Sequence, residues 1–196
     1  MPPSEPAQRH PGSADDSPLT AALARALPRR AGALSVVELC AATATLSEAV
    51  RGSASGDVGA YRPVGPEIDP ACLPFDDRSW DVVIGFDVLR RSSDPRAAAA
   101  EITRICRRRV ILAEWNGINV RHWPRVLRDR PAPDRCRSPR WLLSLFGRGD
   151  YRWLGATPVP VSGASERWLA GIPMLRWQCQ AVMIVGQRAP AWRLAA

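Results

Sequence analysis

Short runs of consecutive apolar residues, separated by polar turns, are the dominant pattern along the chain. One run extends from Val82 to Phe86, and a second extends from Val110 to Ala113. Neither run alternates apolar with polar positions, which is typical of parallel strands buried on both faces. The pattern therefore predicts two central strands of a parallel sheet.

The segment between these two runs has the features of a helix. Asp94 is a suitable N-cap, and Pro95 occupies the first helical position. Ala98, Ile102 and Ile105 recur at helical spacing and give the helix one apolar side. A strand, a helix and a strand in this order predict a right-handed crossover in a parallel sheet.

Ligands of such sheets bind beyond the carboxyl ends of the strands. At that end the first predicted strand is followed by Phe86 and Asp87, and the second by Glu114, Trp115 and Asn116. These positions are the first candidates for a site.

Weaker patterns predict the remaining elements. Residues 1–17, rich in Pro, Ser and Asp, are expected to form a disordered tail, and residues 18–196 a single domain. Within that domain we expect a helix over 19–27, a strand over 34–39, a turn over 40–45, a helix over 47–51, brief strands over 57–62 and 66–68, a helix and a Pro/Arg loop over 117–138, helical turns over 139–146, and strands over 151–161 and 177–187.

Composition excludes several classes of protein. No apolar run approaches the length of a membrane span, and the amino-terminal residues do not resemble a secretory signal. The five cysteines are scattered and form no Cys-x-x-Cys pair, so we expect neither a disulfide scaffold nor a metal site. This cysteine usage favours a cytoplasmic location.

The net charge of +8 is carried entirely by arginine, and it is concentrated in residues 104–140, which hold eleven arginines against three acids. Such a segment could attract phosphates. An arginine-rich solvated surface is the favoured interpretation, with Arg107 to Arg109 on an exposed turn, so nucleic acid is not expected as a partner.

The stretch Leu73-Pro-Phe-Asp-Asp-Arg-Ser-Trp-Asp-Val-Val83 resembles the LPF-x-D-x-SFD-x-V signature of type 11 class I S-adenosylmethionine-dependent methyltransferases. The likeness covers about residues 33–188. It implies an α/β, doubly wound, mostly parallel seven-stranded Rossmann-like sheet with helices on both faces. It also implies S-adenosylmethionine as cofactor and a small-molecule methyl acceptor as partner.

The family's cofactor loop follows the first strand as acid-x-Gly-x-Gly-x-Gly. Here the acid is kept as Glu38, whereas Cys40, Ala42 and Ala44 occupy the glycine positions. An L-residue in the left-handed conformation costs about 1–2 kcal/mol. Three such positions would cost up to about 3–6 kcal/mol, which is roughly a hundredfold to ten-thousandfold in affinity.

The family also places an acid on the ribose hydroxyls at the end of the second strand. The resemblance aligns Tyr61 with that acid, and Asp57 or Glu67 remains an alternative. Asp69 matches the family's acid near the adenine, although it could equally be a loop cap. Residues expected at the cofactor are Glu38, Cys40, Ala42, Tyr61, Asp69, Phe86 and Asp87.

No catalytic residue is assigned. Asp87 lies where the resemblance places the transferred methyl group, but it could merely cap the next turn. Arg90 and Arg91 replace the family's Glu-His pair, so a histidine base is missing. Cys40 is either a reactive thiol or, as we favour, a small buried filler. The tryptophans after residue 114 could wall an acceptor pocket.

These observations favour an S-adenosylmethionine-dependent methyltransferase that acts on a small molecule. The missing glycines and ribose acid keep a second interpretation open, in which the fold serves as a binding or regulatory partner or catalyses another reaction such as a cyclisation. A nucleic-acid binder is a remote third. The sequence does not indicate the acceptor, the pathway or the oligomeric state.

Overall fold

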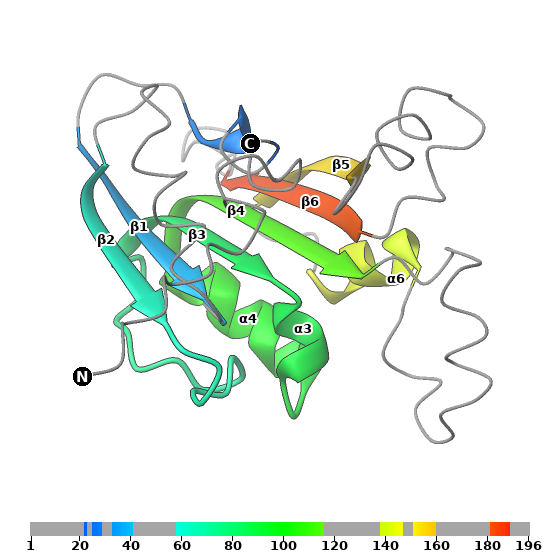
Figure 1. The fold of residues 1–196 in the computed structure, drawn as a ribbon, viewed down its shortest axis with the longest axis horizontal. Coiled ribbons are helices and arrows are strands. Elements are labelled where there is room, and N and C mark those ends of the chain that lie inside the picture. Colours follow the sequence, from blue (N-terminus) through cyan, green and yellow to red (C-terminus); the bar gives the residue numbers. More distant parts are fainter. Residues whose placement is uncertain are drawn as a thin grey trace, which may run out of the picture.

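The computed structural model describes residues 22, 25–28, 33–40, 58–115, 138–146, 151–159 and 181–188. Within them, six strands form one sheet in the order β2-β1-β3-β4-β6-β5 (Figure 1). The strands are β1 (Leu34–Leu39), β2 (Val58–Val64), β3 (Trp80–Phe86), β4 (Cys106–Trp115), β5 (Tyr151–Val159) and β6 (Ala181–Arg188). Strands β1 to β4 pair in parallel, whereas β6 runs antiparallel to both β4 and β5.

The central strands β3 and β4 form where the unbroken apolar runs predicted them. Val82, Val83 and Ile84 of β3 are fully buried, as are Val110 to Ala113 of β4. Burial on both faces explains the absence of alternation, because neither face meets water.

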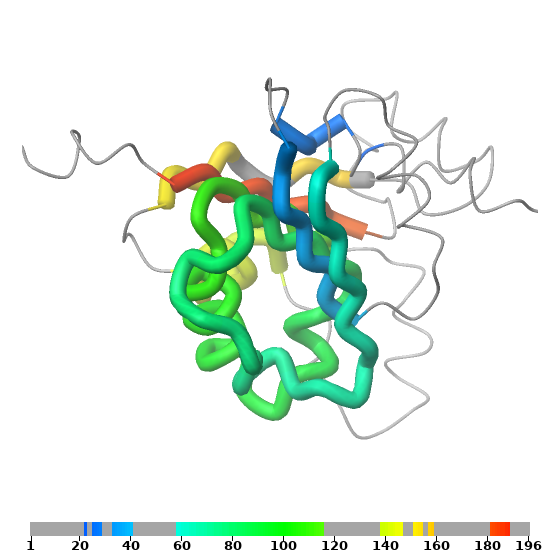
Figure 2. Tube along the Cα trace, turned by 90° about the vertical axis from the view of Figure 1, so that its left-hand side faces the viewer, coloured from blue at the N-terminus to red at the C-terminus, as the bar shows by residue number. Residues whose placement is uncertain are grey.

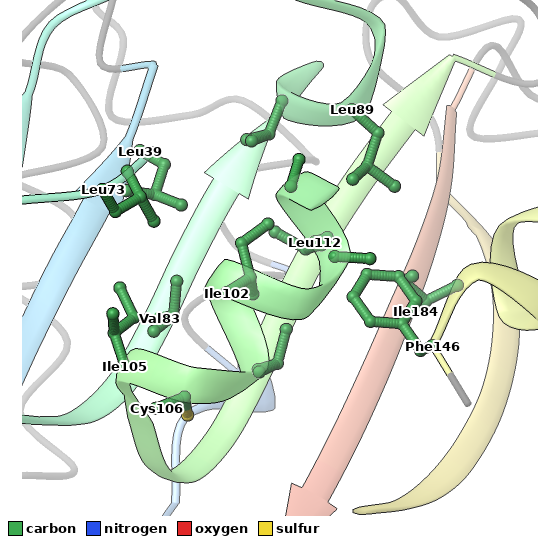
Figure 3. Close-up of a cluster of buried hydrophobic side chains, with 14 of the residues drawn as sticks. Leu39, Leu73, Val83, Leu89, Ile102, Ile105, Cys106, Leu112, Phe146 and Ile184 are labelled. Carbon is green, nitrogen blue, oxygen red and sulfur yellow. The ribbon is translucent and has the colours of Figure 1, made fainter. Parts of the chain in front are cut away.

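Helix α4 (Pro95–Ile105) connects β3 to β4 and follows its predicted cap. Asp94 accepts hydrogen bonds from the backbone N–H groups of Arg96 at 2.8 Å and Ala97 at 3.3 Å. The apolar side of the helix, with Ile102 and Ile105 fully buried, faces the sheet (Figure 3). Two shorter helices, α3 (Val88–Arg91) and α6 (Pro139–Leu145), lie beside it in the same core.

Both faces of the sheet are covered. The cluster under α3, α4 and α6 includes Leu89, Ile102 and Leu112, whereas a second cluster on the other face joins Leu27 to Val36 and other buried strand residues. Figure 2 shows the green segment of α3 and α4 on one side of the sheet and the dark-blue residues 25–28, which precede β1, on the other. The doubly wound α/β fold expected from the sequence is therefore confirmed.

The Leu73-to-Val83 signature has a structural role, because its first residues bind the carboxyl-terminal part of α4. Arg104 donates to the carbonyl oxygens of Leu73 at 3.2 Å and Phe75 at 2.8 Å, and its guanidinium pairs with Asp77 and Glu101. Glu101 in turn accepts from the backbone N–H of Leu73. Helix α4 thus fixes the loop that leads into β3.

Two expectations differ from the structure. Residues 66–68 form a turn and not a strand, because β2 continues to Val64 and the chain then turns at Gly65. Arg107 to Arg109 lie within β4 and not on a turn, since the strand begins directly after α4.

Several predictions concern residues outside the described ranges. These are the tail over 1–17, the helix over 47–51, the helix and loop over 117–138, and the first residues of the strand expected over 177–187. They remain predictions.

Candidate functional site

The carboxyl ends of the parallel strands meet at one edge of the sheet. Leu39 at the end of β1 pairs with Val64 of β2 and Gly85 of β3, and Phe86 pairs with Ala113 of β4. The residues that follow or end these strands therefore lie together, which is the position of ligand sites in such sheets. Five acids and one cysteine from the sequence analysis occur here: Glu38, Glu67, Asp69, Asp87, Glu114 and Cys40.

Glu38 and Tyr61 are brought together across β1 and β2. The Tyr61 hydroxyl donates a hydrogen bond to Oε2 of Glu38, whose residue is only 6 % exposed. Burial raises the pKa of the Glu38 carboxyl, and the bond from Tyr61 opposes that rise. The two expected site residues thus interact with each other.

The expected position of Tyr61 at the end of the second strand is wrong. Tyr61 pairs with Val36 inside the sheet, because β2 continues for three residues beyond it to Val64. Glu67 is the acid that follows the strand end, and its side chain is exposed. The Glu67 carboxylate folds back toward Gly65, where a Cβ atom would overlap it.

Cys40 has a backbone φ of 56°, in the left-handed region. This is the conformation for which the resembled family uses its first loop glycine. The side chain packs into the cluster under α3 and α4, and the residue is 7 % exposed. Burial raises the thiol pKa to about 11, so the neutral thiol predominates at neutral pH and the filler interpretation is favoured.

Asp69 connects two turns. Its carboxylate accepts from the backbone N–H of Ala71 at 2.9 Å, from the Ser92 hydroxyl at 3.0 Å and from the Ser93 hydroxyl. These bonds, that from Ser93 foremost, lower the pKa of Asp69. The loop-cap role is therefore present in the structure, while the role near an adenine remains a proposal. Ala42, the other expected loop residue, lies outside the described ranges.

Asp87 directly follows β3 and has a backbone φ of 60°. Its side chain is 3 % exposed and binds the Arg90 guanidinium through both oxygens, with Nε of Arg90 2.6 Å from Oδ1. Arg91 lies further away, its Nε 3.6 Å from Oδ2. The two arginines that replace the family's Glu-His pair thus hold this acid. No side-chain cap of α3 by Asp87 is formed.

Glu114, the second-to-last residue of β4, binds the first turn of α3 instead. Its Oε1 accepts from the backbone N–H of Leu89 at 2.9 Å. Burial raises the pKa of Glu114 to about 8, the backbone bond from Leu89 opposes the rise, and the charge of Asp87 adds to it. The carboxyl-end edge of the sheet therefore contains a buried carboxylic acid that is largely protonated at neutral pH.

An aromatic pair lines the same edge. Phe86 and Trp115 meet edge to face, with ring centroids 5.3 Å apart and an interplanar angle of 62°. The ring pair lies at the same ends of β3 and β4 as the buried carboxyl groups of Asp87 and Glu114.

Sequence reasoning included Glu114 among the first candidates but not in the cofactor set, and it missed the contact of Arg90 with Asp87. The pairing of opposite charges three residues apart on a helix was a usable signal for the second. The described part of the chain shows no His, Cys, Asp and Glu cluster that could hold a metal ion. His122 lies outside it.

Four arginines at the start of the 104–140 segment, Arg104 and Arg107 to Arg109, make internal contacts. Arg104 pairs with Glu101 and Asp77, while Arg107 and Arg108 contact Asp81. The acids in these ion pairs neutralise part of the local positive charge. None of the helices in the described ranges has the length and apolarity needed to cross a membrane.

Solved structures with a similar fold include several methyltransferases and a cyclase. A putative methyltransferase of Haloferax volcanii, solved with the Trm112 methyltransferase activator, has a TM-score of 0.62 at 17% identity, covering 87% of this chain and 89% of that one. An S-adenosylmethionine-dependent methyltransferase of Aquifex aeolicus has a TM-score of 0.61 at 8% identity, covering 92% and 94%. The [4+2]-cyclase SpnF has a TM-score of 0.53 at 15% identity, covering 88% and 80%.

No protein-family model and no curated protein matches the chain. The structural likeness establishes that the chain has the class I S-adenosylmethionine-dependent methyltransferase fold.

Proposed function

We infer that the chain is an S-adenosylmethionine-dependent methyltransferase acting on a small molecule, with its site at the carboxyl ends of β1 to β4. The observation that carries this proposal is the backbone of Cys40. Its φ of 56° keeps the left-handed turn after β1, and its side chain packs into the core. The loss of the first glycine therefore does not by itself close the loop to a cofactor.

The remaining parts of a nucleoside site are also supported. Glu67 follows the end of β2 as an exposed carboxylate, which can accept two hydrogen bonds from a pair of vicinal hydroxyls. Asp69 lies two residues further along the chain, on the adenine side in our assignment. The cofactor would supply an activated methyl group on a sulfonium.

The methyl acceptor would bind at the carboxyl ends of β3 and β4, beside Phe86, Asp87 and Trp115. The edge-to-face ring pair offers apolar surface against which an acceptor would pack. Orientation of the acceptor and exclusion of water are the contributions we assign to these residues. We assign no general base, and we propose a cytoplasmic location because the described cysteines are free thiols.

Calorimetry with S-adenosylhomocysteine tests the proposal. We expect saturable binding that weakens by roughly tenfold to a hundredfold in Glu67→Ala, since a charge-assisted pair of hydrogen bonds is lost. Asp76→Asn is the matched control, because it removes another exposed loop acid before β3, and its affinity should equal that of the wild type. Absence of heat at millimolar ligand, or equal loss in both variants, contradicts the proposal.

A second candidate is a protein of this fold that has lost methyl transfer. The observations that favour it are the bond of Tyr61 to Glu38 and the engagement of Asp87 by Arg90, which occupy polar groups at the site. SpnF is named as a cyclase and has the same fold. Restoring Cys40, Ala42 and Ala44 to glycine separates the candidates: a large gain in S-adenosylhomocysteine affinity favours lost function, and an unchanged affinity favours the methyltransferase.

A further inference from the structure

Arg91 lies in the crevice between β1 and β3. The strand order β2-β1-β3-β4 makes this crevice the topological switch point of the sheet, because the chain leaves β1 to one side and continues from β3 to the other. Nε of Arg91 is 3.6 Å from Oδ2 of Asp87, the residue after β3. Burial raises the pKa of Cys40, the residue after β1, to about 11, and the positive charge of Arg91 opposes that rise. The guanidinium is therefore near the ends of both strands.

The hydrogen-bonding capacity of Arg91 is unused within the part of the chain that the structure describes. Arg90 binds both oxygens of Asp87, and the approach of Arg91 to the same carboxylate is longer than a hydrogen bond. A guanidinium has five N–H donors in a planar fork that matches a carboxylate. The side chain of Arg91 is 39% exposed, so a ligand can reach these donors.

The backbone on both sides of Arg91 is anchored. Leu89, two residues before it, is fully buried in the core under α3 and α4 (Figure 3). The hydroxyls of Ser92 and Ser93, which follow it, both donate to the carboxylate of Asp69. The arginine thus projects from a fixed base, which lowers the entropy lost when it binds a ligand.

The described side chains beside Asp87 offer no evident general base. Asp87 is engaged by Arg90, burial raises the pKa of Glu114 to about 8, and the described ranges contain no histidine. Arg91 itself replaces the histidine of the resembled family. A hydroxyl or amine acceptor loses a proton during methyl transfer, whereas a carboxylate is already ionised at neutral pH. The site therefore suits an acceptor that arrives as an anion.

We propose that the methyl acceptor is a small-molecule carboxylate bound by Arg91, an inference that rests on the proposed methyltransferase function. One carboxylate oxygen accepts hydrogen bonds from the guanidinium, and the other attacks the methyl carbon of the sulfonium. A C–O bond forms while the C–S bond breaks, and the electron pair of the broken bond goes to sulfur. The products are a methyl ester and S-adenosylhomocysteine. The negative charge of the carboxylate and the positive charge of the sulfonium cancel, and no proton is transferred.

Ligand-observed NMR on the full chain, with saturating S-adenosylhomocysteine, tests the recognition step. Cinnamate is the probe, and cinnamyl alcohol is its neutral counterpart. We expect cinnamate to bind saturably and at least about tenfold more tightly than the alcohol, because charge-assisted hydrogen bonds require the carboxylate. Equal binding of the two compounds, or no saturable binding of cinnamate, overturns the proposal.

Substitutions assign the selectivity to Arg91. Arg91→Gln should weaken cinnamate binding by about tenfold and leave the alcohol unchanged, and Arg91→Lys, which keeps the charge but not the planar fork, should recover part of the loss. Arg96→Gln is the matched control, because it removes another exposed arginine, from α4, and should bind cinnamate as the wild type does. Equal loss in Arg91→Gln and Arg96→Gln overturns the proposal.

Transfer of a tritiated methyl group from S-adenosylmethionine tests the reaction. Mild alkali hydrolyses methyl esters to methanol and leaves methyl ethers intact, so we expect alkali-labile label with cinnamate and no label with cinnamyl alcohol. Label on the alcohol, or no label on cinnamate in a chain that binds S-adenosylhomocysteine, overturns this proposal and leaves the proposed function standing. Absence of S-adenosylhomocysteine binding contradicts both.

Discussion

The hydroxyl of Tyr61 on β2 donates a hydrogen bond to the buried carboxylate of Glu38 on β1. Removing it with Tyr61→Phe leaves the ring packed and takes a donor away from a carboxyl that burial already disfavours as an anion. We expect the pKa of Glu38 to rise further and the free energy of unfolding at neutral pH to fall by about 1–3 kcal/mol. Urea denaturation measures the second effect.

The control for this prediction is a double-mutant cycle. Glu38→Gln alone, and together with Tyr61→Phe, separates the pair interaction from other effects of each substitution. If the two substitutions are additive, the hydrogen bond makes no net contribution to stability and the prediction is wrong.

The left-handed backbone of Cys40 leads to a second prediction, on the order of stability among substitutions. Glycine normally destabilises relative to alanine, but at positive φ alanine is strained by about 1–2 kcal/mol. We therefore expect Cys40→Gly to be more stable than Cys40→Ala by roughly 0.5–1 kcal/mol, measured by urea denaturation. The usual order, with alanine more stable, would show that φ at this position is negative in solution.

The same geometry changes the affinity argument made from sequence. Cys40 is in the left-handed region in the folded chain, so we expect the strain at this position to weaken folding rather than cofactor binding. Cys40→Gly alone should therefore leave the S-adenosylhomocysteine affinity within about threefold of the wild type. The cost of about 3–6 kcal/mol expected for three left-handed loop positions therefore does not convert directly into lost affinity for the cofactor.

Local signals account for what the sequence predicted well. The buried strand Val82–Phe86 and the capped start of α4 at Asp94 each depend on a few neighbouring residues, and both are present. The end of β2 depends instead on pairing with β1, which no local pattern encodes. This is why Tyr61 was placed at the strand end and why Glu67 remained only an alternative.

The candidate site was predictable in position and less so in its contacts. The rule for parallel sheets placed Asp87 and Glu114 at one edge, where the structure has them. The bond from Leu89 to Glu114 joins residues 25 apart in sequence, and the raised pKa follows from burial that only the folded chain produces. Sequence patterns indicate which residues end a strand, but not which backbone group each side chain meets.

Glu114 makes stability depend on pH. Its folded pKa is about 8, above the ordinary value of 4.5, so the folded state binds more protons than the unfolded state between these values. Stability contributed by the protonated form is therefore lost as the pH rises from about 4.5 to 8, at up to roughly 1 kcal/mol per pH unit. Glu114→Gln keeps an acceptor for the Leu89 N–H and should flatten this part of the profile.

Urea unfolding from pH 5 to pH 8 measures the effect. Glu67→Gln is the matched control, because Glu67 is an exposed acid on the same edge of the sheet and its substitution should leave the profile unchanged. A Glu114→Gln profile parallel to that of the wild type would show that Glu114 is ionised throughout this range.

The two arginines that hold Asp87 differ in geometry, which allows a direct comparison. Arg90 binds both oxygens of the buried carboxylate, whereas the closest approach of Arg91 is 3.6 Å. We expect Arg90→Gln to lower the free energy of unfolding by about 1–3 kcal/mol and Arg91→Gln by less than about 1 kcal/mol. Because asparagine tolerates the φ of 60° at position 87, Asp87→Asn should recover part of the loss in Arg90→Gln. Equal effects of the two arginine substitutions in urea denaturation would show that Asp87 interacts with them only through general charge, and not through the paired hydrogen bonds to Arg90.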